Sequence, residues 1–132
     1  MKLGVVGGRD FNDKKKMWDI LNAGVHKIEI IVSGGARGAD KLAAEWCQRI
    51  LGKEPIVFEA DWDNLDVTPC VIKTRKDGSR YNAAAGVIRN KKIVEEADKI
   101  LAFWDGKSPG TKTTIELSKE MKVPCTVVYY HG

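Results

Sequence analysis

The 132-residue sequence lacks the features that mark a membrane protein, a disulfide-stabilised domain or a metal site. It has no run of about 18 apolar residues, which a transmembrane helix needs. Its N-terminal residues are interrupted too early by glycine and charge to form a signal peptide. The three cysteines, Cys47, Cys70 and Cys125, lie too far apart for a paired zinc motif and are odd in number, and the only histidines are His26 and His131. We therefore expect a cytoplasmic domain without a metal site, a bound cofactor or a membrane partner.

The excess of positive charge is also small. Twenty-two Lys and Arg residues face 18 Asp and Glu residues, a formal net charge of +4. Such a balance permits a phosphate-bearing partner but does not require one. The apolar fraction of 43%, with charges of both signs interspersed, excludes a wholly disordered chain. The length predicts a single domain over residues 1–132.

Short apolar runs alternate with longer amphipathic stretches, which predicts strands and helices in the order βαβαβ, a long connection, and αβαβ. Because the apolar runs are continuous, their strands are expected to be buried on both faces of a parallel sheet. We predict an α/β fold: a Rossmann-like, doubly wound, mainly parallel five-stranded sheet of order 3-2-1-4-5 with helices on both faces. The strands are expected at residues 3–6, 28–32, 56–58, 100–104 and 126–130. The helices are expected after an Asn12 or Asp13 cap, with apolar positions from Met17 to Gly24, and at residues 39–51, 83–97 and 114–121.

The long connection lacks clear periodicity and is predicted to be an irregular insertion or lid at about residues 61–80. A small hairpin is expected within it, at residues 71–78. Its basic side chains favour two interpretations equally: a lid over a polyphosphate, or a solvated hairpin whose charges maintain solubility. These side chains are Lys73, Arg75, Lys76 and Arg80.

Three glycine-bearing loops follow the first, second and fourth predicted strands, at residues 7–11, 33–40 and 105–114, and hold seven of the 13 glycines. In a sheet of order 3-2-1-4-5 these strands are neighbours, so their loops converge on one crevice at the carboxyl edge. Glycine lets backbone N–H groups approach a ligand closely, and a helix N-terminus favours an anion. A phosphate is the ligand that this pattern predicts.

The loops also supply the candidate side chains, although neither GxGxxG nor GxxxxGK[ST] is present. Asp40 is either a ligand for ribose or a compensating charge at a helix N-terminus, and Asp10 either binds ligand or caps a turn. Trp62 and Trp104 either stack on a base or belong to the core. The predicted ligand-binding residues are Gly7, Gly8, Arg9, Asp10, Ser33, Gly34, Gly35, Arg37, Gly38, Asp40, Arg89, Asn90, Trp104, Gly110, Thr111, Thr113 and Thr114.

Five motifs occur in order along nearly the whole chain, at residues 7–11, 33–40, 60–62, 85–90 and 102–106, the last followed by Ser108, Gly110 and Thr111. In this combination the sequence resembles the SLOG superfamily, most closely its small, largely uncharacterised branch from bacteria and phages. The resemblance implies a Rossmann-like sheet that binds nucleotides or nucleotide-derived ligands at these loops. It also implies that Arg89 and Asn90 face the same pocket.

The superfamily includes the lonely-guy phosphoribohydrolases, which cleave the base from a nucleoside monophosphate and carry PGGxGTxxE with a catalytic glutamate. In this sequence Leu117 stands at the glutamate position and Glu116 lies one residue earlier, a rotation of about 100° on a helix. The arginine that pairs with that glutamate corresponds to Arg89. The candidate catalytic residues are Arg89, Glu116 and Asp40, with Asp105 as a further acid.

Three functions follow as alternatives. The first is a nucleotide-binding sensor or sequestering domain, and the second is an N-glycosidic hydrolase acting on a nucleoside monophosphate. The third is a single-stranded nucleic-acid binder, suggested by the basic balance and by Trp62, Tyr81 and Trp104. The superfamily also includes DNA-processing proteins that hold single strands and sensors of NAD-derived signals. A homo-oligomer that pairs through helices is compatible with the sequence.

Overall fold

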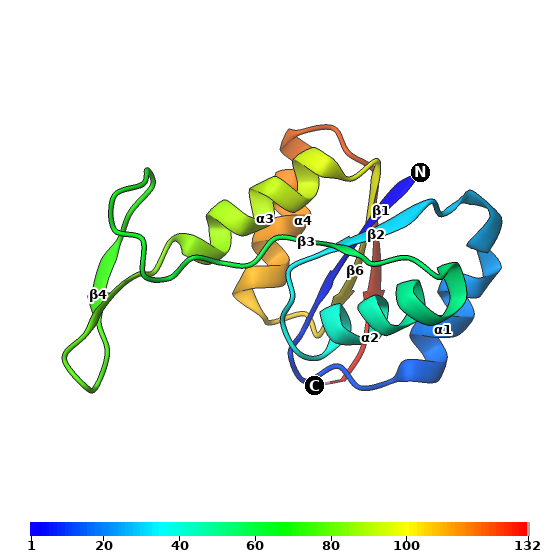
Figure 1. The fold of residues 1–132 in the computed structure, drawn as a ribbon, viewed down its shortest axis with the longest axis horizontal. Coiled ribbons are helices and arrows are strands. Elements are labelled where there is room, and N and C mark those ends of the chain that lie inside the picture. Colours follow the sequence, from blue (N-terminus) through cyan, green and yellow to red (C-terminus); the bar gives the residue numbers. More distant parts are fainter. Residues whose placement is uncertain (132) are drawn as a thin grey trace.

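The structure is a computed structural model, and it describes residues 1–131 (Figure 1). Its strands are β1 (Lys2–Gly7), β2 (Ile30–Ser33), β3 (Ile56–Val57), β4 (Ile72–Thr74), β5 (Arg80–Asn82), β6 (Lys99–Trp104) and β7 (Cys125–Tyr129). Its α-helices are α1 (Lys14–Ala23), α2 (Ala39–Trp46), α3 (Ala85–Glu96) and α4 (Pro109–Glu120). A 3₁₀ turn at Val25–Lys27 follows α1, and a π-helical segment at Cys47–Leu51 extends α2.

Five strands form one sheet in the order β3-β2-β1-β6-β7, and all four neighbouring pairs are parallel. The predicted order 3-2-1-4-5 is confirmed, since β6 and β7 are the fourth and fifth strands of this sheet. Helices α1 and α2 pack on one face, and α3 and α4 pack on the other. Within residues 1–131 no helix is long and apolar enough to cross a membrane.

Several element boundaries differ from the predicted ones, and each has a local cause. Helix α4 begins at Pro109 rather than at Thr114, because proline has no N–H to satisfy and its fixed φ suits the first helical position. Strand β2 begins at Ile30 rather than at Ile28, because the 3₁₀ turn ends just before Ile28. Asp13, one of the two predicted caps, accepts a hydrogen bond from the Lys16 N–H at the start of α1.

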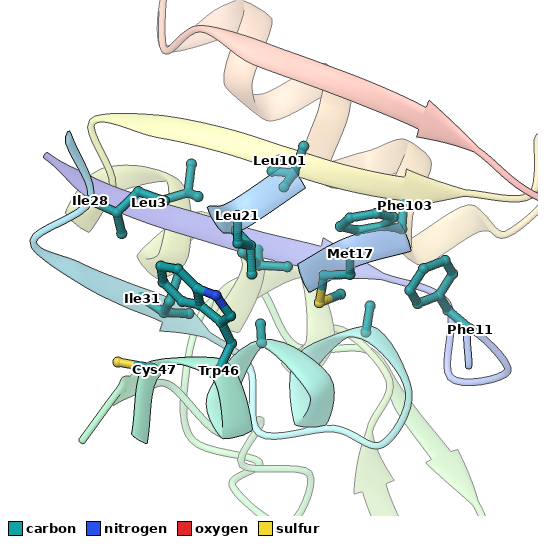
Figure 2. Close-up of a cluster of buried hydrophobic side chains, with 13 residues drawn as sticks. Leu3, Phe11, Met17, Leu21, Ile28, Ile31, Trp46, Cys47, Leu101 and Phe103 are labelled. Atoms are coloured by element: carbon teal, nitrogen blue, oxygen red, sulfur yellow. The ribbon is translucent and has the colours of Figure 1, made fainter. Parts of the chain in front are cut away.

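The core on the α1–α2 face is built around Trp46, which is fully buried. Its indole Nε1 donates to Asn22 Oδ1 at 2.8 Å, so the one polar atom of the ring is satisfied. Figure 2 shows Met17 and Leu21 of α1 lying between Trp46 and the strand that carries Phe103. This packing fixes α1 and α2 against the sheet and so fixes the loops that precede them.

The long connection between β3 and α3 carries a hairpin of β4 and β5, which pair antiparallel with Ile72 opposite Asn82. The hairpin projects away from the sheet (Figure 1). Its base is anchored by the buried Asn82 side chain, whose Oδ1 accepts from the N–H groups of Val71 and Ala84 at 3.1 and 2.9 Å. The predicted hairpin therefore exists, with its return strand ending at Asn82 rather than at residue 78.

The packing of α1 predicts unequal effects of two adjacent substitutions. Leu21 is 1% exposed and Ile20 is 36% exposed. Leu21→Ala should lower the free energy of unfolding by about 2–5 kcal/mol, because it removes buried methyl groups and leaves a cavity. Ile20→Ala should lower it by less than about 1 kcal/mol. Urea unfolding followed by circular dichroism measures both, and equal losses would contradict this packing.

Candidate functional site

A cavity of about 730 Å³ opens at the carboxyl edge of the sheet. Residues from the loops after β1, β2 and β6 line it together with side chains from α3 and from the long connection. The lining residues are Val6, Gly7, Gly8, Arg9, Asp10, Ala36, Asp40, Trp62, Ala83, Gly86, Val87, Arg89, Asn90, Ile93, Ser108, Pro109, Gly110, Thr111, Thr113 and Thr114. The structure thus brings the three glycine-bearing loops to one place.

Glycine allows the first two of these loops to touch each other. The Ala39 N–H donates to the Gly8 carbonyl at 3.3 Å. A Cβ on Gly38 would lie 2.3 Å from that same carbonyl oxygen, and Gly38 has a φ of +81°, which disfavours any other residue. A Cβ on Gly7 would lie 2.7 Å from the Ala39 Cβ. These glycines are therefore required for loop packing, whatever ligand the cavity holds.

The first turn of α4 faces the cavity and offers backbone donors. Gly110 and Thr111 lie in this turn, where helix geometry provides no intrahelical acceptor for an N–H group. The helix dipole adds partial positive charge at the same place. Thr113 and Thr114, two of the predicted ligand-binding residues, line the cavity, but their hydroxyls donate to the Pro109 and Gly110 carbonyls at 2.8 and 3.2 Å. Their oxygen lone pairs remain as acceptors.

Arg89 connects three parts of the site. Its Nη1 donates to the Gly34 carbonyl at 2.9 Å, and its Nε donates to Asn90 Oδ1 at 2.9 Å. Asn90 Nδ2 in turn donates to the Gly110 carbonyl at 3.4 Å. The guanidinium therefore links the loop after β2, helix α3 and the start of α4. Burial lowers the pKa of Arg89, and the nearby Asp40 carboxylate opposes that shift.

Asp40 lies buried in the first turn of α2 and lines the cavity. Its Oδ2 accepts a hydrogen bond from the Ala36 N–H at 3.2 Å. Burial raises the pKa of Asp40 to about 6, because loss of solvent disfavours the carboxylate more than this hydrogen bond and the charges of Arg89 and Arg9 favour it. The side chain can therefore gain or lose a proton near neutral pH.

A second, smaller pocket of about 290 Å³ adjoins the cavity. Gly34, Gly35 and Arg37 of the loop after β2 line it, and four further residues line both spaces. The pocket is lined by Arg9, Gly34, Gly35, Ala36, Arg37, Glu59, Ala60, Trp62 and Arg89, of which Arg9, Ala36, Trp62 and Arg89 are shared. The cavity and this side pocket thus form one two-part site with Arg89 in the dividing wall.

Several predicted site residues do not line either space. Trp104 donates its Nε1 to the Ser108 carbonyl at 3.0 Å, and its ring packs against Tyr129. Ser33 is buried at the end of β2, and its Oγ has no hydrogen-bond partner within residues 1–131. Glu116 is exposed on α4, so the structure does not bring it to Arg89 and Asp40. Gly38 also lines neither space; it lies in the close contact between the loops after β1 and β2.

Asp105, the further acid, is also outside the cavity. Its carboxylate accepts from the N–H groups of Lys107 and Ser108 at 2.9 and 2.8 Å, and these bonds lower its pKa. It therefore holds the turn that leads into α4. In the part of the chain that the structure describes, no three His, Cys, Asp or Glu side chains gather in a group that could hold a metal ion.

The predicted list omitted part of the cavity wall, namely Val6, Ala36, Trp62, Ala83, Gly86, Val87, Ile93, Ser108 and Pro109. Trp62, which the sequence analysis considered for stacking on a base but left out of that list, is the largest of these side chains. A Cβ on Gly86 would lie 3.3 Å from the Trp62 Cη2, so glycine at this position of α3 leaves room for the indole. The signal available in the sequence was the pair of motifs at 60–62 and 85–90, but their contact needs the folded chain.

Comparisons with known proteins identify the family and the fold. The model of the YspA, cpYpsA-related SLOG family (YAcAr) matches residues 1–64. The Gene 61 protein of Mycobacterium phage D29 is 30% identical over 128 residues, which cover 91% of this chain and 90% of that protein. Among solved structures, DNA processing protein A from Helicobacter pylori, described for its single-stranded DNA binding mode, aligns with a TM-score of 0.70 at 19% identity. That alignment covers 99% of this chain and 66% of the solved chain, and it supports the fold.

The raised pKa of Asp40 predicts a specific pH dependence of stability. Between about pH 4 and pH 6 the folded protein keeps a proton on Asp40 that the unfolded chain has lost, so the free energy of unfolding falls as the pH rises from about 4 through about 6 and is level above that range. Relative to Asp40→Asn, the native protein should lose about 3 kcal/mol of unfolding free energy between pH 4 and pH 8. Denaturant unfolding at several pH values measures this difference.

The control is Glu116→Gln, which removes an exposed carboxylate outside the cavity and should retain the loss of stability assigned to Asp40. Parallel pH profiles for the native protein and Asp40→Asn would show that Asp40 titrates at its ordinary pKa and would contradict the prediction.

Proposed function

The chain belongs to the SLOG superfamily, and from that premise we propose that its cavity binds a nucleotide or nucleotide-derived ligand as a sensor or sequestering domain. The observation that carries the proposal is that loops from β1, β2 and β6, the first turn of α4 and the Arg89 guanidinium all line one cavity. Its volume of about 730 Å³ lies within the range of small-molecule sites.

The phosphate is proposed to lie between Arg89 and the first turn of α4. Arg89 uses Nε and Nη1 in its hydrogen bonds to the protein, and Nη2 makes none within residues 1–131. A guanidinium nitrogen and the N–H groups of Gly110 and Thr111 would then share the phosphate oxygens. Charge-assisted hydrogen bonds of this kind are about twice as strong as neutral ones.

The base and sugar are proposed to occupy the rest of the cavity. Trp62 and Val87 provide an apolar wall, and a half-buried indole is a suitable surface for a base. The Asp40 side chain can accept a hydrogen bond from a ribose hydroxyl when it is ionised.

An N-glycosidic hydrolase acting on a nucleoside monophosphate is a second candidate. It is favoured by Asp40, a buried carboxyl group in the cavity with a pKa raised to about 6, which suits proton transfer near neutral pH. Release of free base during incubation with a nucleoside monophosphate, abolished in Asp40→Asn, would support this activity. Release that persists in Asp40→Asn would exclude the proposed role of Asp40.

Single-stranded nucleic acid is a third candidate ligand, suggested by the structural likeness to DNA processing protein A. Strand binding of this kind weakens steeply with salt, because phosphate contacts release counterions. A gel shift with single-stranded oligonucleotides at low and high salt tests it directly, and no shift even at low salt would remove it.

The main proposal is tested by calorimetry with AMP, ADP-ribose, NAD and a cyclic nucleotide. At least one should bind, and Arg89→Ala should weaken its binding by about 10- to 100-fold, because a hydrogen-bonded charge is lost. Gly34→Ala should weaken it as well, since the new Cβ would lie 2.5 Å from Arg89 Nη1 and displace the guanidinium.

Arg49→Ala is the matched control, because Arg49 is exposed after α2 and lines neither the cavity nor the side pocket. Its affinity should equal that of the native protein. Failure of every nucleotide to bind, or equal losses in Arg49→Ala and Arg89→Ala, would overturn the proposal.

A further inference from the structure

The connection between β3 and α3 separates acidic from basic residues. Its first part, residues 59–66 (the stem), contains Glu59, Asp61, Asp63 and Asp66 and no basic residue. Its second part, residues 71–82 (the arm), contains Lys73, Arg75, Lys76 and Arg80 against the single acid Asp77. All of these side chains except the half-buried Arg75 belong to exposed residues.

One ion pair joins the arm to the stem within the chain. Arg75 Nη2 lies 3.2 Å from Asp63 Oδ1, and Asp77 accepts hydrogen bonds from the Ser79 N–H and hydroxyl. Within residues 1–131 this is the one ion pair that joins arm and stem. Three cations of the arm and three carboxylates of the stem are therefore left in solvent.

The arm also exposes apolar side chains. Val71 and Ile72 are each 51% exposed, although both belong to residue types that are usually buried. The arm pairs with no strand of the main sheet, and a two-stranded hairpin alone is marginally stable in water. The arm projects away from the main sheet and from the helices that pack on it (Figure 1).

We propose that stem and arm form the interface of a symmetric dimer in which the arm of each copy packs on the stem of the other. A two-fold interface brings the same surface of both copies together, so a surface carrying equal numbers of free cations and carboxylates is complementary to itself. Stem and arm comprise 20 residues, which fits the lower end of a standard interface of about 20–30 residues a side.

The same charges argue against a polyanion as the partner. Over residues 59–82 five acidic residues outnumber four basic ones, so a phosphate backbone that reached the arm would also meet the carboxylates of the stem. The isolated basic lid that the sequence suggested is thus half of a segment with mixed charge. This inference does not depend on the ligand of the cavity.

The oligomeric state in solution tests the proposal. Sedimentation velocity of the native chain at low salt should give twice the monomer mass of 14.6 kDa, and high salt should shift the equilibrium toward monomer. An arm variant, Lys73→Glu with Lys76→Glu, should be monomeric at the same protein concentration. A stem variant, Asp61→Lys with Asp66→Lys, should also be monomeric, and an equal mixture of the two variants should restore the dimer mass.

The matched control is Lys27→Glu with Lys41→Glu, which makes the same charge change at exposed residues outside the segment and should remain dimeric. Circular dichroism confirms that each variant is folded. A native chain that is monomeric at every concentration, a dimer that survives in both single-segment variants, or a mixture that stays monomeric would each overturn the proposal. A monomer whose arm retains single-stranded oligonucleotide would overturn it as well.

Discussion

The parallel pairing of β1 with both β2 and β6 is the constraint on which the site depends. Leu3 of β1 lies opposite Ile31 on one side and Lys99 on the other, so the three strands point the same way and end at the same edge. Glycine at position 4 supports this arrangement, because a Cβ there would lie 2.5 Å from the Ile100 Cδ1. Three loops that are far apart in the sequence therefore meet, and the cavity is a consequence of strand direction.

The site at this edge of the sheet holds charges of both signs that are shielded from solvent: Asp40 is buried and Arg89 is half-buried. Arg89 is held by a carbonyl and an amide oxygen rather than by a direct ion pair with Asp40. The two groups still influence each other, since each charge opposes the effect of burial on the pKa of the other. An anionic ligand would gain from Arg89 and lose from an ionised Asp40, so the proton on Asp40 links ligand affinity to pH. Under the proposed function, the same two residues would therefore influence both stability and binding.

Much of this could be predicted from the sequence, because the signals involved are local. Continuous apolar runs such as that ending at Val6 predicted buried parallel strands, and the strand order placed the three glycine loops together. What the sequence could not provide is contact across long separations. Arg89 meets Gly34 across 55 positions, and only the family resemblance pointed to it. The start of α4 was missed because Pro109 and Gly110 are typical of a loop as well as of a first helical turn, and the orientation of Trp104 depends on its bond to the Ser108 carbonyl.

The central claim is that the cavity, rather than another surface, holds a phosphate-bearing nucleotide. An NMR titration of the isotope-labelled chain with a nucleoside monophosphate tests it most directly, because it reports the position of binding as well as its occurrence. The account predicts saturable shifts concentrated at the backbone amides of Gly7, Gly8, Ala36, Gly110 and Thr111. A separate pocket is lined by residues that include Asp105, Tyr129 and His131. Saturable shifts confined to that pocket, or no saturable shift with any nucleotide, would contradict the account.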